Sequence, residues 1–175
     1  TMQEWFKSPE EMALIFEDHP EALANTIEIA NKIEPFDLNK TPVMPEFPIP
    51  EEFGTIDNYK IKFSEKDLIS EFNEETYTRL GGYNNSLRIK FEADYLQHLV
   101  EIGSINRYGK NPNEEIQQRI SFELQTLKNM GFPGYLLIVH DFIAQARSMG
   151  IWVGPGRGSA AGSVVSYCLQ ITDID

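Results

Sequence analysis

The sequence predicts an α+β fold that is mostly helical, with few strands and a separate helical segment at its N-terminus. Three observations lead to this prediction. Apolar residues recur at helical spacing along much of the chain, one short run resembles a strand, and a proline-rich stretch interrupts the pattern. With 175 residues, 41% of them hydrophobic and 24% charged, the chain can bury a core and is neither disordered nor collagen-like in composition.

Two helices are expected at the N-terminus. The first begins after Ser8, a suitable cap, with Pro9 in the first helical position and Glu11 in the reciprocal capping position. The second begins at Pro20 and ends before Pro35, because proline cannot continue a helix.

Residues 35–54 contain the best internal boundary. Proline lacks the amide hydrogen and fixes φ, so a run of prolines predicts an extended linker. The five prolines are Pro35, Pro42, Pro45, Pro48 and Pro50. We therefore divide the chain into residues 1–50, a helical segment with its linker, and residues 51–175, a larger domain. Residues 55–90 carry turn signals and scattered charges, and they predict no regular element.

Helical periodicity returns between Glu92 and Arg107. Asn111 is expected to cap the next helix, and Gly131 is expected to follow its last turn in the left-handed conformation. These signals predict two amphipathic helices.

The remaining elements are a helix, a strand and a helix. Residues 134–149 contain an apolar run that fits either a strand or a helix, and a 3.6-residue period over the whole segment favours one buried helix. Residues 151–153 predict a short strand, and residues 160–169 predict the last helix. Four aromatic residues are interpreted as core residues rather than stacking platforms for bases: Tyr135, Phe142, Trp152 and Tyr167.

Charge and cysteine content exclude several classes of protein. The net charge is −12, so phosphate backbones would be repelled and a general nucleic-acid binder is not expected.

No apolar run is long enough to span a membrane. The single cysteine, Cys168, excludes a disulfide framework and is expected to pack as a small hydrophobic residue, as suits a protein of the cytoplasm. His19, His98 and His140 are too scattered to predict a metal site.

The segment GPGRGSAAGS, residues 154–163, is the candidate functional site. It lies between the predicted strand and the predicted last helix, and its glycines permit positive φ and close approach of the backbone. Ser159 is expected to cap the helix, and Arg157 carries a fork of donors that matches phosphate oxygens. The spacing fits neither a Walker loop nor a dinucleotide fingerprint. We predict an anion site, and a tight turn that binds nothing remains the alternative.

The C-terminal quarter of the chain carries a family resemblance. The stretch GFPGYLLIVHDFIAQARSMGIWVGPGRGSAAGSVVSYCLQITDID resembles the palm of the C family of bacterial replicative DNA polymerases, the DNA polymerase III alpha subunits. Further upstream, HPEALANTIEIANKI and PVMPEFPIPE resemble the junction after that family's polymerase-and-histidinol-phosphatase (PHP) domain. The chain opens at Thr1 without the features of a natural start, and we expect it to be a segment of a larger protein.

The resemblance implies a fold and a site. It implies that residues 1–50 are the junction after the PHP domain and that residues 51–175 are the first part of a palm of the polymerase-beta-like nucleotidyltransferase fold. In that family a Gly-Ser pair grips the triphosphate of the incoming nucleotide, which here would be Gly158 and Ser159, with Arg157 as a phosphate contact. The catalytic aspartates of the family would lie beyond Asp175, so no catalytic or metal-binding residue is assigned to this chain.

The resemblance also implies a function. The parent protein would be a replicative DNA-directed DNA polymerase that uses Mg²⁺, dNTPs and primer-template DNA and works with other replicase subunits in the cytoplasm, away from membranes. Because phosphoryl transfer needs metal ions held by carboxylates, we expect this segment to need no cofactor and to be inactive alone. The alternative is an acidic helical module that binds other proteins, in which the glycine-rich loop is purely structural.

Overall fold

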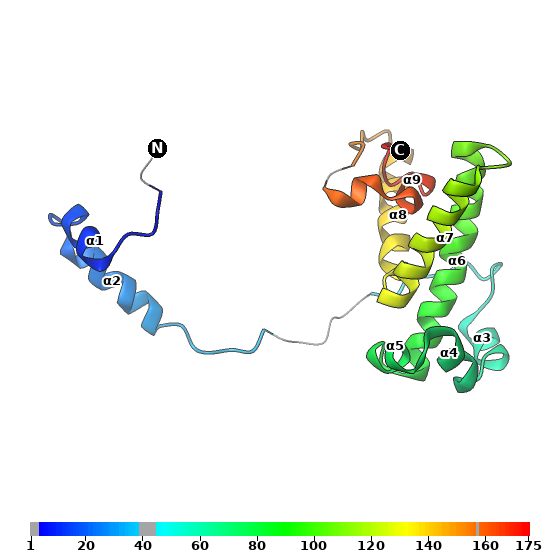
Figure 1. Cartoon of the computed structure of the whole chain (residues 1–175), viewed down its shortest axis with the longest axis horizontal. Helices are drawn as coiled ribbons and strands as arrows, with labels where there is room; N and C mark the ends of the chain where they lie inside the picture. The colour runs from blue at the N-terminus through cyan, green and yellow to red at the C-terminus, as the bar shows by residue number, and fades with distance from the viewer. Residues whose placement is uncertain (1–3, 39–44, 157) are drawn as a thin grey trace. The chain divides into compact units, whose positions relative to one another are not determined.

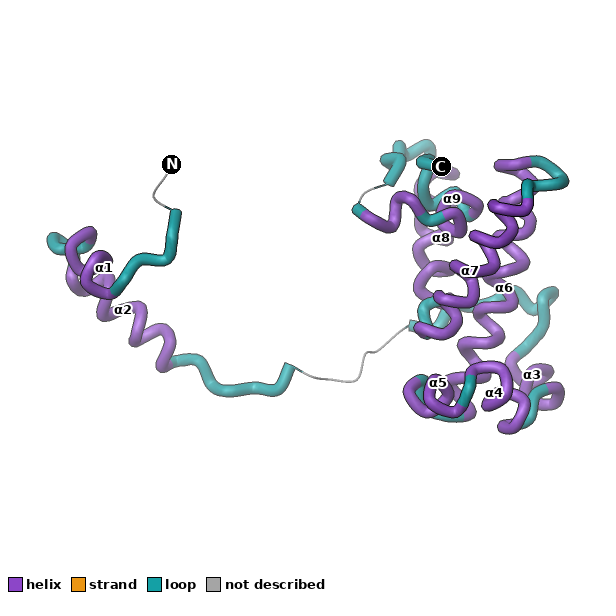
Figure 2. The backbone as a smooth tube through the Cα atoms, in the orientation of Figure 1, coloured by secondary structure: helices purple, strands orange, loops and turns teal. Residues whose placement is uncertain are grey.

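The computed structural model describes residues 4–38, 45–156 and 158–175, with Ser159 described by its backbone alone. The chain divides into two compact units, Thr1–Pro42 and Val43–Asp175. Every regular element in the described residues is a helix, as Figure 2 shows by colour. None of these helices combines the length and the apolar character that crossing a bilayer requires.

The first unit contains the two helices expected from the sequence, α1 (Pro9–Ile15) and α2 (Pro20–Asn31). The capping box is confirmed: Glu11 N donates to Ser8 Oγ over 3.3 Å, and Ser8 N donates to Glu11 Oε2 over 2.9 Å. Neither helix contains a buried residue, and Leu14 and Ile27 are 74% and 64% exposed. These two helices therefore present apolar side chains that the described part of the unit does not cover.

Residues 55–90, for which the sequence predicted no regular element, begin with three short helices. These are α3 (Ile56–Lys62), α4 (Glu65–Phe72) and α5 (Glu74–Arg79). Each is capped by the side chain of the residue before it: Thr55, Ser64 and Asn73 accept a hydrogen bond from the amide three residues later. The interpretation was wrong because it weighed scattered charges and overlooked these caps, which are local signals strong enough to start a helix.

Helix α6 (Tyr83–Tyr108) forms the centre of the second unit. It begins well before Glu92, the predicted start, and contacts α3, α4, α7, α8 and α9 (Figure 1). Two hydrophobic clusters form along it. One joins α6 to α4 and α5 through Leu68, Phe72, Tyr77, Leu87 and Ile89. The other joins α6 to α8 and α9 through Leu96, Val100, Leu137, Val164, Val165, Cys168 and Leu169.

Helices α7 (Glu114–Met130) and α8 (Pro133–Ser148) pack beside α6 (Figure 1). The cap of α7 is Asn113, whose Oδ1 accepts from Ile116 N over 2.9 Å, and not the predicted Asn111. The predicted role of Gly131 is confirmed, since it follows α7 with φ of 80°. The helix predicted over residues 134–149 is also confirmed.

The strand predicted at residues 151–153 is wrong. Ile151 N donates to Ala146 O over 3.0 Å, after Gly150 has turned the chain with φ of 74°, so this segment completes the C-terminal cap of α8. Trp152 is 98% exposed, and the described residues contain no strand with which it could pair. The strand component of the expected α+β class is therefore absent from the described residues, which are helical throughout their regular structure.

The single helix predicted over residues 160–169 is two elements. A 3₁₀ turn, η1 (Ser159–Gly162), is followed by α9 (Val164–Cys168). The break occurs at Ser163, whose Oγ accepts from Ser166 N over 3.1 Å and starts a new helix there. Ser163, and not the predicted Ser159, is therefore the cap of α9.

Glu92 is a carboxylate within the core of the second unit. Its side chain is 3% exposed and pairs with Arg88 Nη1 at 2.9 Å. Burial raises the pKa of Glu92, and the neighbouring Arg88 opposes that rise only in part.

The raised pKa of Glu92 predicts a pH dependence of stability. As pH rises above the unfolded-state pKa of about 4.3, the unfolded chain ionises first, so the folded state loses stability relative to a Glu92→Gln variant. We expect the difference in unfolding free energy, wild type minus variant, to fall between pH 4 and pH 7. Urea unfolding of both proteins across that range measures it, and a difference that rises with pH would contradict the assignment.

Candidate functional site

The glycine-rich segment connects the C-terminus of α8 to η1 and α9. Of the three predicted site residues, Arg157 lies outside the described residues, and for Ser159 only the backbone is described. Gly158 is described, with φ of 66°. Gly158 directly precedes the 3₁₀ turn, and Ser159 is its first residue. The first amides of such a turn have no acceptor within the turn itself.

Two glycines of the loop have different roles. Gly156 has φ of 129°, and a Cβ there would lie 3.0 Å from Thr172 Cγ2 and 3.3 Å from Ala161 Cβ. Gly156 is therefore needed for packing of the loop against the rest of the unit. A Cβ at Gly158 would meet no described atom within 4 Å, so at Gly158 glycine supplies conformation while the described residues leave the space beside it open.

The start of the loop is fixed by Asp173. Its amide donates to Pro155 O over 2.9 Å, and its carboxylate pairs with Arg107 Nη2 at 2.7 Å and Arg147 Nη2 at 2.9 Å. Hydrogen bonding from Arg107 lowers the pKa of Asp173, and the charge of Arg147 adds to the effect. We call Asp173 with these two arginines the Asp173 clamp.

The end of the loop is fixed by Glu123 of α7. Glu123 is 9% exposed, and its Oε2 accepts from Ser163 Oγ over 2.7 Å and from Val165 N over 3.2 Å. Its other oxygen accepts from Arg119 Nε over 2.7 Å. One buried carboxylate thus holds the cap of α9 and an amide of its first turn in place.

A pocket of about 410 Å³ lies between the loop and α8. Its walls include Gly154 and Gly156 of the loop and Phe142 of α8. The interpretation of the four aromatic residues as core was wrong for Tyr135, Phe142 and Trp152, which are 52%, 55% and 98% exposed. Tyr167 is half-buried, and the guanidinium of Arg107 lies 4.1 Å above its ring.

The acidic residues beside the loop do not form a metal site. Asp173 is occupied by the two arginines, and Asp175 Oδ1 accepts from Tyr108 Oη over 2.5 Å. No group of three or more His, Cys, Asp or Glu side chains in the described residues could hold a metal ion. His140 Nδ1 donates a hydrogen bond to Leu169 O over 2.8 Å, so this ring is engaged within the unit.

The packing role expected of Cys168 is confirmed. It is 1% exposed within the cluster around α6, and burial raises its pKa to about 11. A thiol with that pKa is protonated at neutral pH and is not a nucleophile.

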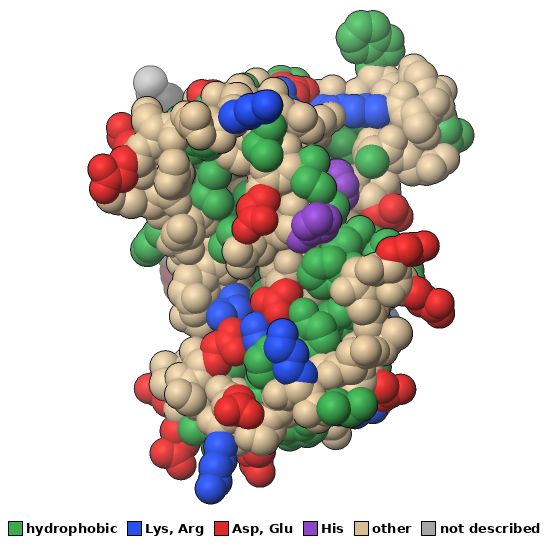
Figure 3. Space-filling view, turned by 90° about the vertical axis from the view of Figure 1, so that its right-hand side faces the viewer, with side chains coloured by type: hydrophobic (Ala, Val, Ile, Leu, Met, Phe, Trp, Pro, Cys, Tyr) green, Lys and Arg blue, Asp and Glu red, His purple; other side chains and the backbone are tan. Residues whose placement is uncertain are grey.

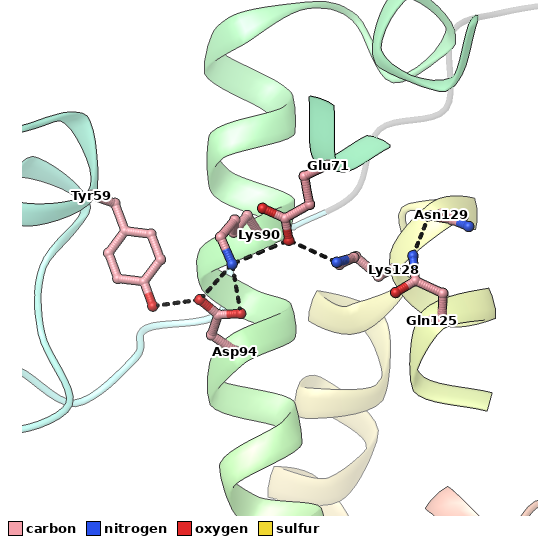
Figure 4. Close-up of polar contacts among 7 residues, drawn as sticks. All are labelled: Tyr59, Glu71, Lys90, Asp94, Gln125, Lys128 and Asn129. Carbon is pink, nitrogen blue, oxygen red and sulfur yellow. Dashed lines mark hydrogen bonds and ion pairs between the residues drawn. The ribbon is translucent and has the colours of Figure 1, made fainter. Parts of the chain in front are cut away.

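A second group of charged residues lies where α4, α6 and α7 meet (Figure 4). Lys90 Nζ binds both carboxylate oxygens of Asp94 at 3.0 Å, and Glu71 Oε1 accepts from Lys128 Nζ over 2.7 Å and pairs with Lys90 at 3.2 Å. Tyr59 Oη donates to Asp94 over 2.8 Å. Because each of these charged groups is paired within the network, we interpret it as a structural link between helices rather than a site for a ligand.

The surface of the second unit carries both signs of charge. Figure 3 shows basic side chains beside acidic ones on one face, with hydrophobic side chains between them. On that face the basic residues do not gather into a continuous positive patch of the kind that binds a phosphate backbone. An anion site on that face would therefore depend on local geometry rather than on a broad positive field.

Sequence reasoning did not identify the residues that fix the loop. Arg107, Glu123 and Arg147 lie on three different helices, and the first two are distant from the loop in sequence. Their patterns resemble ordinary charged positions on helix surfaces. Only the folded arrangement brings them to the loop.

Known proteins resemble this chain along its whole length. The family described as "Bacterial DNA polymerase III alpha NTPase domain" matches residues 94–175. The DNA polymerase III subunit alpha of Campylobacter jejuni is 41% identical over 172 residues, covering 98% of this chain and 13% of that protein. The subunits of Helicobacter pylori strain J99 and Borreliella burgdorferi are 41% and 39% identical, covering 98% and 100% of this chain and 12% of each relative. The chain thus spans about one eighth of the length of these relatives.

Proposed function

We propose that this chain, which belongs to the family of bacterial DNA polymerase III alpha subunits, helps a DNA-directed DNA polymerase to bind the incoming nucleotide. Residues 51–175 are then the first part of the palm domain, of the polymerase-beta-like nucleotidyltransferase fold. Residues 1–50 are the junction that follows the PHP domain. The substrates of the parent protein are dNTPs and primer-template DNA, and its partners are other replicase subunits in the cytoplasm.

The observation that carries this proposal is the loop held at both of its ends. Asp173 fixes the chain at Pro155, Glu123 fixes it at Ser163, and the space beside Gly158 between these points is open. A fixed backbone that presents amides at a helical start suits the oxygens of a phosphate chain. We assign the triphosphate grip to Arg157, Gly158 and Ser159, with the guanidinium of Arg157 supplying the compensating charge.

The Mg²⁺ of the parent enzyme is assigned elsewhere. The two aspartates nearest the loop, Asp173 and Asp175, are engaged by arginines and a tyrosine, and they do not fit a divalent cation. We therefore derive no metal-dependent step from this segment. Its contribution is to bind and orient the phosphate chain, which lowers the entropic cost of reaching the transition state.

Substitutions in the loop test this assignment. In a full-length alpha subunit that carries this sequence, Arg157→Ala is expected to raise the KM for dNTP, or lower kcat, by about tenfold or more, because one charge-assisted contact to phosphate is lost. Ser159→Ala is expected to act in the same direction with a smaller effect. Steady-state incorporation on a primed template measures both parameters, and circular dichroism checks the fold.

Lys66→Ala is the matched control, because it removes one positive charge from an exposed position on α4. It should leave both parameters unchanged. Loop variants that fold normally and also change neither KM nor kcat would contradict the assignment. Template-directed incorporation by the isolated chain would refute the further expectation that this segment is inactive alone.

A protein-binding module remains the second candidate function. It is favoured by the exposed apolar side chains of the first unit, such as Leu14 and Ile27, and by the net charge of −12. In that case the glycine-rich loop is structural, and the loop variants above would leave nucleotide kinetics unchanged. The same measurement therefore distinguishes the two functions.

A further inference from the structure

We propose that Asp173 is a positioning residue for the incoming nucleotide, acting through the loop rather than by touching the substrate. The inference rests on the proposed function of the loop. It concerns a carboxylate that two arginines engage and to which no role in nucleotide binding has been assigned so far.

Two core helices meet at Asp173. Arg107 comes from α6 and Arg147 from α8, and each binds a different oxygen of the one carboxylate. Both arginines also donate to the backbone that follows α9: Arg107 Nη2 to Thr172 O over 3.0 Å and Arg147 Nη1 to Gln170 O over 2.5 Å. The segment that carries Asp173 is thereby fixed to two helices of the core.

The segment that carries Asp173 contacts the start of the loop directly. Asp173 N donates to Pro155 O over 2.9 Å, and Thr172 packs beside Gly156, where an added Cβ would lie 3.0 Å from Thr172 Cγ2. Displacement of Asp173 therefore displaces the backbone at Pro155 and Gly156, directly before the residues assigned to the triphosphate. The path from the arginines to the loop consists entirely of direct contacts.

The Asp173 clamp is expected to contribute little to the stability of the unit. The side chains of Arg107, Arg147 and Asp173 are 23%, 29% and 43% exposed, and ion pairs at such exposure contribute little to folding. The hydrophobic cluster around α6 does not include Asp173. Loss of the carboxylate is therefore expected to loosen the start of the loop while the unit stays folded.

The test uses Asp173→Asn in a full-length alpha subunit that carries this sequence. The amide keeps the size of the side chain but replaces one acceptor with a donor that faces a guanidinium, so one arm of the clamp is lost. We expect the KM for dNTP to rise about tenfold, while kcat at saturating dNTP stays within about threefold. A fall in kcat without a rise in KM would overturn the inference.

Asp175→Asn is the matched control. It makes the same chemical change two residues away, at a carboxylate whose hydrogen bond goes to Tyr108. It should leave both parameters within about twofold of the wild type. A rise in KM as large as that of Asp173→Asn would mean that the whole segment, and not the clamp, is responsible, and this also would overturn the inference.

Arg147→Met supplies a second route to the same prediction, including the case in which Asp173→Asn fails to fold. Each variant weakens the same clamp, so the double variant should raise KM by less than the product of the two single effects. Additive effects would contradict the clamp. In the same proteins, hydrogen exchange should rise in peptides covering residues 154–163 and stay unchanged in α6, whereas a general loss of stability would raise both.

The outcomes also separate this inference from the proposed function. If the Arg157 and Ser159 variants raise KM and the Asp173 variant does not, the loop binds nucleotide and the inference alone fails. If none of them affects nucleotide kinetics, the proposed function fails and the inference fails with it.

Discussion

Replacing Gly103 with alanine is expected to lower the free energy of unfolding by about 3 kcal/mol, the upper part of the usual range for overpacking a well-packed core. Gly103 lies in α6 where the end of α9 crosses it. A Cβ there would contact the carbonyl oxygen of Cys168 and lie 2.7 Å from the carbonyl carbon and 3.3 Å from Cα of the same residue. These are backbone atoms, so no side-chain rotation can relieve the contact.

Whether Gly103→Ala lowers or raises the free energy of unfolding shows whether α6 and α9 pack closely at this position. Within an exposed helix the same substitution would stabilise by about 1 kcal/mol, since alanine has the higher helix propensity. Gly162→Ala is the control, because a Cβ there would meet nothing within 4 Å among the residues that the structure describes. Thermal and urea unfolding of the two variants measure the difference, and a Gly103→Ala protein as stable as the wild type would show that α6 and α9 do not pack this closely.

Replacing Glu123 with alanine is expected to cost a similar amount, about 3 kcal/mol. The ion pair with Arg119 contributes little to this, because the side chain of Arg119 is 59% exposed. The larger cost comes from Ser163 Oγ and Val165 N, which would lose their common acceptor in a part-buried site. Two donors left without a partner there account for most of the expected loss.

Glu123→Gln separates the acceptor from the charge. It keeps an oxygen for Ser163 and Val165 and turns its amide group toward Arg119, so we expect a loss of about 1 kcal/mol. The midpoint of urea unfolding at an unchanged m-value reports these differences. Equal losses for the alanine and glutamine variants would indicate that charge, and not the hydrogen bonds at the start of α9, accounts for the contribution of Glu123.

Local signals in the sequence predicted much of the helical structure. The capping box at Ser8 and Glu11 and the left-handed Gly131 each depend on a few neighbouring residues, and both are confirmed. The helices at residues 55–79 depend on similar caps, and a search for Thr, Ser or Asn before short amphipathic runs would have found them. These elements could be predicted because their determinants lie within one or two turns of chain.

The strand at residues 151–153 and the core position of Trp152 could not be predicted correctly from local sequence. A run of β-branched and aromatic residues fits a strand only when a neighbouring strand completes its hydrogen bonds, and the described residues provide none. The helix cap formed with Ala146 O takes the amide of Ile151 instead. Tertiary context decided the conformation in this segment.

The loop of the candidate site could be predicted from local sequence, whereas the contacts that hold it could not. The composition of residues 154–163 was enough to indicate a loop suited to an anion, because glycine and serine have distinctive backbone chemistry. The carboxylates that hold the loop, Asp173 and Glu123, gave no signal of that role. Asp173 pairs with arginines of α6 and α8, and Glu123 of α7 accepts hydrogen bonds at the start of α9. Such long-range pairings require knowledge of the fold.

The central position of α6 has a consequence for how the second unit unfolds. Leu87 and Ile89 near one end belong to one cluster, and Leu96 and Val100 farther along belong to the other. Loss of either cluster would destabilise α6, on which the other cluster also depends. The two clusters should therefore unfold in a single cooperative transition. A destabilising substitution in the short helices near Leu68 should therefore raise the population of globally unfolded molecules. The glycine-rich loop would be affected in this way although no residue near it has changed.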